Sequence, residues 1–253
     1  MSERPAPEAE FTEDALLGGT VRLIQLAVGY RVAIDPVLLA AAVPARPGDQ
    51  VLDVGAGVGA AALCLARRVE GCRVSGLERQ RALVRLANDN AALNRLADRV
   101  DIMEGDLLRP PPRLAPGCYD HVMTNPPHLD PAREVPSPQP ARAASMVEGA
   151  AQLPAWIAFC LAMVRPKGSV TVIHRADRLD ALLAALHRKA GEIVVCPLWP
   201  MSDGRSAKRV IVRARKGVDA ATRLAAGFVL HRPDGGYTER IDAVLRRGAA
   251  LEL

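Results

Sequence analysis

The stretch VLDVGAGVG, residues 51–59, decides the fold of this chain. It runs from an apolar, strand-like segment into three glycines spaced one residue apart, and an alanine-rich segment follows it. Glycine lets the backbone turn tightly and approach a ligand closely, as the sharp passage from a parallel strand into the next helix requires. The stretch therefore predicts the first strand and helix of an α/β sheet whose turn faces a bound ligand.

Strand-like and helix-like segments alternate along the chain from residue 50 onward. The predicted strands are Gln50–Gly55, Arg73–Glu78, Arg99–Asp106, Tyr119–Asn125, Gly168–His174, Glu192–Leu198 and Lys208–Arg215. The predicted helices are Gly59–Val69, Gln80–Leu96, Leu153–Val164 and Arg178–Lys189. This alternation is typical of a mainly parallel sheet with helices on both faces. Only a short turn separates the last two strands, so we expect them to pair antiparallel as a hairpin.

The length of 253 residues and the mass of 27.0 kDa suit one large domain with an appendage. We expect a flexible tail at residues 1–10, an N-terminal extension at 11–48 that packs on the core, and the main domain at 49–253. Within the extension, Asp35 is placed to cap a helix whose first residue is Pro36. The alternative is that Asp35 faces a cofactor pocket.

Composition argues against several classes of protein. Hydrophobic residues make up 49% of the chain and charged residues 24%, a globular balance. No run approaches ~18 apolar residues, so we expect no membrane span, and we do not expect the acidic start MSERPAPEAE to act as a secretory signal. The five cysteines, at 64, 72, 118, 160 and 196, form no C-x-x-C pair. We therefore expect no disulfide framework, no metal site and a reducing, cytoplasmic location, while the oligomeric state is left open.

Basic residues gather near the C-terminus. The net charge is +5, yet residues 1–200 hold 22 basic and 22 acidic residues, whereas residues 201–253 hold 11 basic and 6 acidic ones. Six basic residues and no acidic one lie in Arg205–Lys216. Such a stripe is expected where a polyanion docks, most commonly a nucleic acid. The alternative is a solvated strand edge, where charge discourages aggregation.

The glycine turn by itself fits two cofactors. Gly55, Gly57 and Ala60 satisfy the G-x-G-x-x-A pattern of dinucleotide-binding proteins. Glu78, at the end of the second predicted strand, can accept the ribose hydroxyl groups of any nucleotide. The turn therefore leaves a nicotinamide-dependent oxidoreductase open beside an enzyme that uses S-adenosylmethionine.

Two aspartates favour S-adenosylmethionine. Asp53 precedes the first glycine, where its carboxylate can position the amino-acid end of that cofactor. Asp106 ends the third predicted strand, where it can accept from an adenine amino group. The alternative is that both aspartates only form turns.

The tetrapeptide NPPH, residues 125–128, follows the fourth predicted strand and so lies beside the expected cofactor crevice. The two prolines fix the backbone and remove amide donors, which leaves carbonyl oxygens as acceptors. Hydrogen bonds from a planar amine to the Asn125 side chain and the Pro126 carbonyl would free the nitrogen lone pair and aim it at a sulfonium methyl group. This arrangement predicts N-methylation of an exocyclic amine without a metal or a covalent enzyme intermediate.

Together these motifs resemble those of class I S-adenosylmethionine-dependent amino-methyltransferases. More narrowly, the chain is similar to the bacterial tRNA1(Val) adenine-37 N6-methyltransferases over roughly residues 11–245. The segments that carry this similarity are LLGGTVRLIQLAVGYRVAIDPVLLAAAV, PLWPMSDGRSAKRVIVRARKG and the closing FVLHRPDGGYTER. The resemblance implies a Rossmann-like class I methyltransferase fold, with a seven-stranded, mostly parallel sheet, an antiparallel C-terminal hairpin and helices on both faces.

The resemblance also implies the site residues and the substrate, an adenine of tRNA methylated at N6. The cofactor would lie against Asp53, Gly55, Gly57, Gly59, Glu78 and Asp106. Catalysis would fall to Asn125, Pro126, Pro127 and His128. The tRNA phosphates would contact Arg205, Lys208, Arg209, Arg213 and Arg215, of which Arg209, Arg213 and Arg215 alternate onto one strand face.

One residue departs from the family pattern. The family usually carries an aromatic residue after N-P-P, on which the flipped base stacks, whereas this chain has His128. A histidine ring stacks less extensively, which leaves a different acceptor open, such as guanine N2 of ribosomal RNA or a protein glutamine. It also leaves open a non-catalytic RNA-binding protein that has kept the fold.

Overall fold

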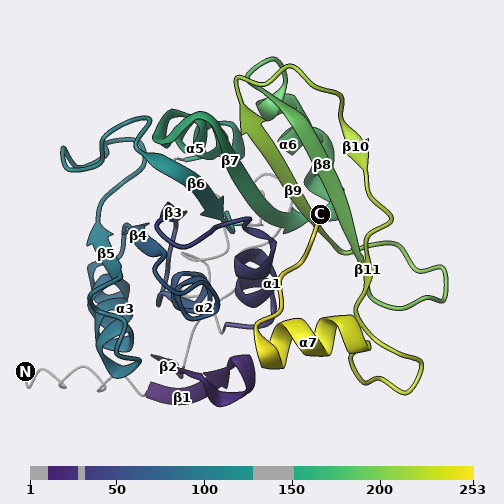
Figure 1. Ribbon diagram of the computed structural model, residues 1–253, viewed down its shortest axis with the longest axis horizontal. Helices are drawn as coiled ribbons and strands as arrows, with labels where there is room; N and C mark the ends of the chain where they lie inside the picture. Colours follow the sequence, from purple (N-terminus) through teal and green to yellow (C-terminus); the bar gives the residue numbers. More distant parts are fainter. Residues whose placement is uncertain (1–10, 28–31, 128–150) are drawn as a thin grey trace, which may run out of the picture.

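A single mixed sheet forms the centre of the protein (Figure 1). The computed structural model describes residues 11–27, 32–127 and 151–253. Its long strands lie in the order β8-β9-β7-β6-β3-β4-β5. They are β3 (Gln50–Val54), β4 (Arg73–Glu78), β5 (Val100–Glu104), β6 (Tyr119–Thr124), β7 (Val164–Arg175), β8 (Ala190–Trp199) and β9 (Arg209–Lys216).

The directions of these strands confirm the predicted sheet. β3 pairs parallel with β4 and β6, and the parallel pairing continues from β4 to β5 and from β6 to β7. β9 runs antiparallel to both β7 and β8, so the last two long strands form the expected antiparallel pair.

The sheet is wider than the seven strands that the sequence predicts. β10 (Arg223–Leu224) and β11 (Phe228–Val229) both pair parallel with β8 and bring the described sheet to nine strands. Strands of two residues carry no readable alternation of polar and apolar side chains, so the sequence pattern does not predict them.

Helices cover both faces of the sheet, as predicted. α1 (Asp35–Ala42), α2 (Ala60–Arg68) and α3 (Arg81–Leu93) pack against one face, and α5 (Leu153–Met163) and α6 (Leu179–Leu186) against the other (Figure 1). The short helix η2 (Ala176–Arg178) precedes α6. The two cores consist mainly of Leu, Val, Ile and Ala, since the chain has only eight aromatic residues.

The residues before α1 form a β-hairpin of β1 (Phe11–Leu16), η1 (Leu17–Gly19) and β2 (Val21–Leu26). Two buried asparagines, Asn90 of α3 and Asn94 just after the end of α3, attach β2. The Asn90 side chain accepts from the Ile24 amide at 2.8 Å and donates to the Ile24 carbonyl at 2.9 Å. Asn94 makes the same pair of bonds to Arg22, at 2.8 and 2.6 Å. These amides satisfy the outer backbone groups of β2 as another strand would.

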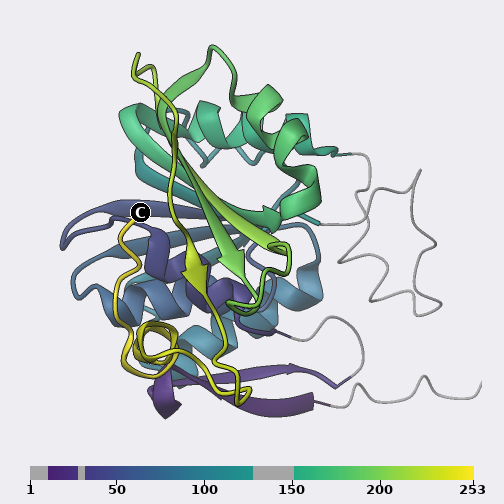
Figure 2. The same ribbon diagram turned by 90° about the vertical axis from the view of Figure 1, so that its right-hand side faces the viewer.

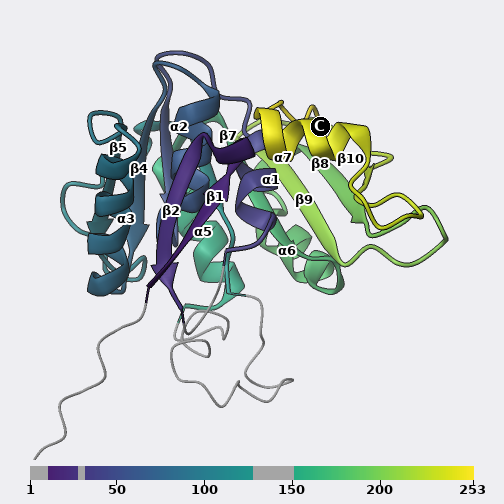
Figure 3. The same cartoon turned by 90° about the horizontal axis from the view of Figure 1, so that it is seen from below.

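The last helix lies beside this hairpin, and the chain then ends against β9. α7 (Glu239–Arg247) contacts η1 and α1, and Figures 2 and 3 show it next to the hairpin, outside the helix layer. The Leu251 amide then donates to the Ala41 carbonyl of α1 at 2.8 Å. The expected tail at 1–10 and His128 lie outside the described residues.

Candidate active site

The turn from β3 into α2 needs glycine for conformation and for space. Three glycines adopt left-handed backbone angles: Gly55 (φ 78°), Gly57 (φ 55°) and Gly59 (φ 86°). The Gly55 and Ala56 amides both donate to the Leu77 carbonyl, at 2.8 and 3.1 Å, which ties the turn to β4. A Cβ atom on Gly55 would lie 2.6 Å from Cη2 of Trp156. The turn is therefore held against α5 at a distance that only glycine allows.

Glu78, the last residue of β4, bonds to the same turn. One carboxylate oxygen accepts from the Gly57 amide at 3.0 Å, and the other accepts from the Gln80 amide at 2.8 Å. Each carboxylate oxygen has a second lone pair for a further donor. The buried Glu78 side chain is thus fixed in one orientation beside the glycine turn.

Asp53 is buried beneath the turn, with 2% of its surface exposed. Its Oδ2 atom has no hydrogen-bond partner among the described residues. Burial raises the pKa of this carboxyl to about 7, against the smaller opposing effect of the Ala62 amide. An unsatisfied buried carboxylate oxygen is costly, and a positively charged ligand group would relieve that cost.

Asn125 follows β6 directly and lies next to the end of β3. The preceding Thr124 pairs with Val54 across the two strands, and its buried hydroxyl donates to the Val54 carbonyl at 2.7 Å. The Oδ1 atom of Asn125 is buried and has no hydrogen-bond partner among the described residues. Pro126 is buried and Pro127 partly buried. A rigid strand end therefore presents an unused acceptor.

Asp106 forms a turn after β5. Its Oδ1 atom accepts from the Leu108 amide at 2.9 Å, and its backbone bridges to Arg109. This is the turn-forming role that the sequence left open for Asp106. Its second carboxylate oxygen is not used in that bond.

The strand order brings these residues to one edge of the sheet. β6, β3, β4 and β5 are adjacent and parallel, so their carboxyl ends lie side by side. β3 is where the order of connection reverses, with β4 on one side and β6 on the other (Figure 1). Ligands of open α/β sheets bind in the crevice at such a point. The glycine turn thus lies between Glu78 and Asn125.

Comparisons with known proteins identify the family to which the chain belongs. The family model described as Methyltransferase small domain matches residues 31–153. A tRNA1(Val) (adenine(37)-N6)-methyltransferase from Porphyromonas gingivalis is 32% identical over 174 residues, which cover 65% of this chain and 67% of that protein. The chain belongs to the tRNA1(Val) (adenine(37)-N6)-methyltransferase family. A protein of the same name from Aeromonas hydrophila is 28% identical over 216 residues, 83% of this chain and 86% of that protein.

The chain is therefore an S-adenosylmethionine-dependent methyltransferase, as the sequence predicts. This family contradicts the alternatives of a nicotinamide-dependent oxidoreductase and of a non-catalytic RNA-binding protein. The fold resembles that of a predicted O-methyltransferase from Agrobacterium tumefaciens, with a TM-score of 0.71 at 24% identity over 86% of this chain and 98% of the other. The TM-score to an S-adenosylmethionine-dependent O-methyltransferase from Thermotoga maritima is 0.53, at 18% identity over 76% of this chain and 68% of the other. At such identities these likenesses show the fold alone.

Asp35 of the methyltransferase does not cap α1, which corrects the sequence prediction. Asp35 is itself the first residue of the helix, and the preceding Ile34 makes no side-chain capping bond. The Asp35 carboxylate instead accepts from Nε of Arg209 at 2.8 Å. The ion pair with Arg209, on a strand distant in sequence, takes the place of a local cap. No local sequence pattern predicts this ion pair.

The basic stripe of the methyltransferase is partly engaged in protein contacts. Arg209 pairs with Asp35, Arg213 donates to the Leu253 carbonyl at 3.2 Å, and Arg215 pairs with Glu192 at 2.8 Å. Burial lowers the pKa of Arg213. Two residues of the stripe, Arg205 and Lys208, lie exposed around the turn between β8 and β9, where Arg205 pairs with Asp203. These two residues are the freest of the five predicted RNA contacts.

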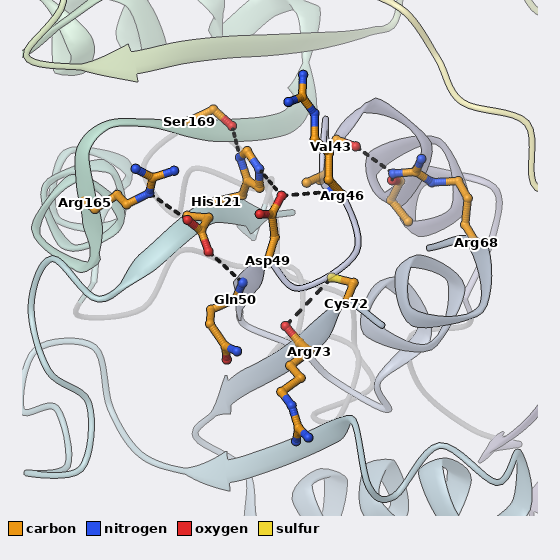
Figure 4. A network of polar contacts seen from close by, with 12 residues as sticks. Val43, Arg46, Asp49, Gln50, Arg68, Cys72, Arg73, His121, Arg165 and Ser169 are labelled. Atoms are coloured by element: carbon orange, nitrogen blue, oxygen red, sulfur yellow. Dashed lines mark hydrogen bonds and ion pairs between the residues drawn. The ribbon is translucent and has the colours of Figure 1, made fainter. Parts of the chain in front are cut away.

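A second polar cluster lies at the opposite, amino edge of the sheet (Figure 4). The ring of His121, on β6, contacts Ser169 Oγ through Nδ1 at 2.8 Å and Asp49 Oδ2 through Nε2 at 3.2 Å. Burial lowers the pKa of His121, against an opposing effect of Asp49. Asp49 Oδ2 also accepts from the Arg46 amide at 2.8 Å. These bonds join the start of β3 to β6 and β7, away from the cofactor crevice.

The sequence does not predict two residues of the site. Trp156 lies against the glycine turn, although about a hundred residues separate the two in the sequence. The only feature of the sequence that singles out Trp156 is that the chain has just two tryptophans. The hydroxyl of Thr124 fixes the strand end before Asn125. The sequence does not indicate this role, because the adjacent NPP motif is the recognisable feature.

Among the described residues, no group of three or more His, Cys, Asp or Glu is placed to hold a metal ion. Nor is any helix of the described part long and apolar enough to cross a membrane.

Proposed function

We propose that this methyltransferase transfers a methyl group from S-adenosylmethionine to N6 of an adenine in tRNA, at position 37 of a valine tRNA, in the cytoplasm. The names of its relatives specify this substrate for them. The observation that carries the proposal is the buried Oδ1 atom of Asn125 at the end of β6, which has no hydrogen-bond partner in the described part of the chain. An amide oxygen in that state is an acceptor for an amino group that enters the crevice from outside.

The residues at the crevice fit S-adenosylmethionine. The unpartnered Oδ2 of Asp53 suits the positively charged amino group at the methionine end, and Glu78 suits the ribose hydroxyls. The left-handed glycines let the backbone approach the ligand between them. The second oxygen of Asp106 suits the adenine amino group. When bound, this cofactor supplies a methyl group on a positively charged sulfur that leaves as a neutral thioether.

Asn125 and Pro126 prepare the amine of the substrate. The two amino hydrogens of adenine donate to Asn125 Oδ1 and to the Pro126 carbonyl, which withdraws the nitrogen lone pair from conjugation with the ring. With the amine held in this way, bound S-adenosylmethionine would supply the methyl group, and one amino hydrogen would be lost to water as a proton. Because Asn125 Oδ1 is buried, its hydrogen bond to the amine is stronger than one in water.

The test is methyl transfer from labelled S-adenosylmethionine into bulk bacterial tRNA that lacks the adenine-37 N6-methyl group, followed by nucleoside analysis. Wild type should place the label in N6-methyladenosine. Asn125→Ala should lower kcat by about 10²–10³-fold while the Kd for S-adenosylmethionine stays unchanged, since it removes one preorganised hydrogen bond to the reacting group.

The other acceptors are tested by offering ribosomal RNA and protein to wild type in parallel with the tRNA. Label in N2-methylguanosine of ribosomal RNA, or in protein, would replace adenine as the acceptor and make His128 the first residue to examine. Full activity of Asn125→Ala would contradict the proposed role of the side chain.

Binding of tRNA is proposed to use the exposed basic residues Arg205 and Lys208. Charge reversal of both should weaken tRNA binding and reduce its dependence on salt, because each phosphate contact releases bound cations. Lys189→Glu is a suitable control, since Lys189 is equally exposed but precedes β8 at the amino edge of the sheet. Equal binding by the doubly reversed variant and the control would contradict this part of the proposal.

A further inference from the structure

A recess of about 560 Å³ lies beyond β11, outside the cofactor crevice. It is formed by the closing segment of the chain and α7, and its lining includes His231, Arg232, Tyr237, Glu239, Asp242 and Arg246. A volume in this range is typical of small-molecule sites. Neither the proposed methyl transfer nor the basic stripe uses any of these residues.

The recess has an aromatic wall. The rings of His231 and Tyr237 stack with their centroids 4.8 Å apart and their planes 26° apart. Their backbones also pair, and the Arg232 amide donates to the Gly236 carbonyl at 2.7 Å, so a tight turn holds the two rings together. A preorganised ring pair is a platform on which a nucleic-acid base stacks.

Charged groups of both signs surround this wall. The Arg232 guanidinium packs over Gly236 and pairs with Asp234 at 3.1 Å, which fixes its position. Arg246, an exposed residue of α7, pairs with Asp242 at 2.6 Å. Guanidinium groups bind phosphates, and carboxylates accept from the amino groups of bases. Rings, arginines and carboxylates in one recess are the groups that recognise a nucleotide.

The recess lies within reach of an RNA held at Asn125. β11 pairs with the last residues of β8, and the His231 amide donates to the Pro200 carbonyl just after β8 ends. The sheet from β6 through β7, β9 and β8 to β11 spans four strand spacings, on the order of 20 Å, and the recess lies past β11 at a somewhat greater distance. An RNA loop spans such a distance, whereas a single nucleotide does not.

We propose that this recess binds a second nucleotide of the RNA substrate, with its base against His231 and Tyr237 and its phosphate at Arg232 and Arg246. The inference rests on the proposed function, because the same RNA presents its target base to Asn125. The recess would then select RNA by a contact outside the catalytic crevice. This also gives a role to the closing segment, one of the specific parts of the family resemblance.

The matched pair Arg246→Ala and Arg247→Ala tests the proposal. Both residues lie on α7, both pair with Asp242, and both are about equally exposed, but Arg246 lines the recess and Arg247 does not. Arg246→Ala should raise the KM for tRNA with kcat and the Kd for S-adenosylmethionine unchanged. Its slope of log binding constant against log salt should fall by about 0.7, as expected for one single-strand phosphate contact. Arg247→Ala should behave as wild type.

Tyr237 tests the aromatic wall. Tyr237→Ala should raise the KM for tRNA about fivefold or more, the lower end of the effect of losing one base–aromatic stack. Tyr237→Phe keeps the ring and should retain the wild-type KM, and unchanged cofactor affinity would show that each variant folds.

The outcomes separate the two proposals. Wild-type methylation of tRNA with Arg246→Ala and Tyr237→Ala both at the wild-type KM would overturn the recess proposal alone. An equal rise in the KM for tRNA with Arg247→Ala would show that only the positive charge of α7 matters, and it would also overturn the recess proposal. Absence of tRNA methylation by wild type would overturn the proposed function and this inference together.

Discussion

Replacing Asp53 by asparagine should change how the stability of the ligand-free enzyme depends on pH. Burial raises the pKa of this carboxyl from its ordinary value of 3.8 to about 7. The folded protein therefore holds a proton that the unfolded chain releases, and the unfolding free energy falls as pH rises from about 4 to about 7. An asparagine side chain cannot ionise, so the variant should lose this dependence.

The magnitude follows from the two pKa values. At ~1.36 kcal/mol per pKa unit, the difference between 3.8 and about 7 corresponds to about 4 kcal/mol over the whole titration. About 2–3 kcal/mol of this lies between pH 5 and pH 8. Asp53 is 2% exposed, so solvent screening gives little reason to reduce the figure.

Urea unfolding of wild type and Asp53→Asn at pH 5, 6, 7 and 8 measures the effect. As pH rises from 5 to 8, wild type should lose about 2–3 kcal/mol of unfolding free energy relative to Asp53→Asn. Subtracting one free energy from the other cancels the contributions of all groups that titrate in both proteins. Asp106→Asn controls for loss of a carboxylate at the same edge of the sheet. A difference between wild type and Asp53→Asn that is constant with pH would refute the buried, unpartnered state of Asp53.

The same pair of proteins connects stability to binding. If the ionised form of Asp53 holds the amino group of S-adenosylmethionine, the affinity of wild type for the cofactor should rise with pH through about 7. Asp53→Asn should bind more weakly and lack this rise. Equal pH profiles for the two proteins would assign the carboxyl a role other than cofactor binding.

Three further predictions concern the frame of the site. Gly55→Ala should lose about 2–4 kcal/mol of stability by thermal unfolding and shift the fluorescence of Trp156, because its Cβ would lie 2.6 Å from the indole at a left-handed φ; a Tm within about 1 °C of wild type would contradict this. Thr124→Val should cost about 1–2 kcal/mol by leaving the Val54 carbonyl without its hydroxyl donor, whereas Thr124→Ser should not, and equal urea midpoints would refute the bond. Burial lowers the pKa of His121, so the unfolded chain takes up a proton first and stability is lost as pH falls below about 6.5; His121→Gln should show a smaller loss between pH 7 and pH 5, and parallel curves would contradict this.

The sequence predicts the central sheet because each long strand carries a strong local signal. β4 begins and ends where the sequence predicts, and β3 and β6 differ by one residue at their carboxyl ends. Buried parallel strands are runs of apolar residues between polar turns, so their positions follow from the chain itself. The glycine turn and NPP follow these strands, so their meeting at one edge of the sheet also follows from strand order.

Features that depend on tertiary contacts could not be predicted. The side chain of Asp35 has a local capping site and a distant arginine available, and only the fold decides between them. The hairpin at 11–26 is attached through Asn90 and Asn94, whose side chains give no sign in the sequence that they bond to another strand. The recess beside α7 combines a turn and a helix that have no common pattern in the sequence.

The attachment of β2 to α3 also bears on self-association. A free strand edge offers unpaired amide and carbonyl groups to any neighbouring chain and so seeds aggregates. In this hairpin, Asn90 and Asn94 occupy those groups of Ile24 and Arg22 along β2. The hairpin's other strand, β1, carries Glu13 and Asp14. The two asparagines thus leave these backbone groups of β2 unavailable to a neighbouring chain, and their replacement by alanine should leave the groups unpaired.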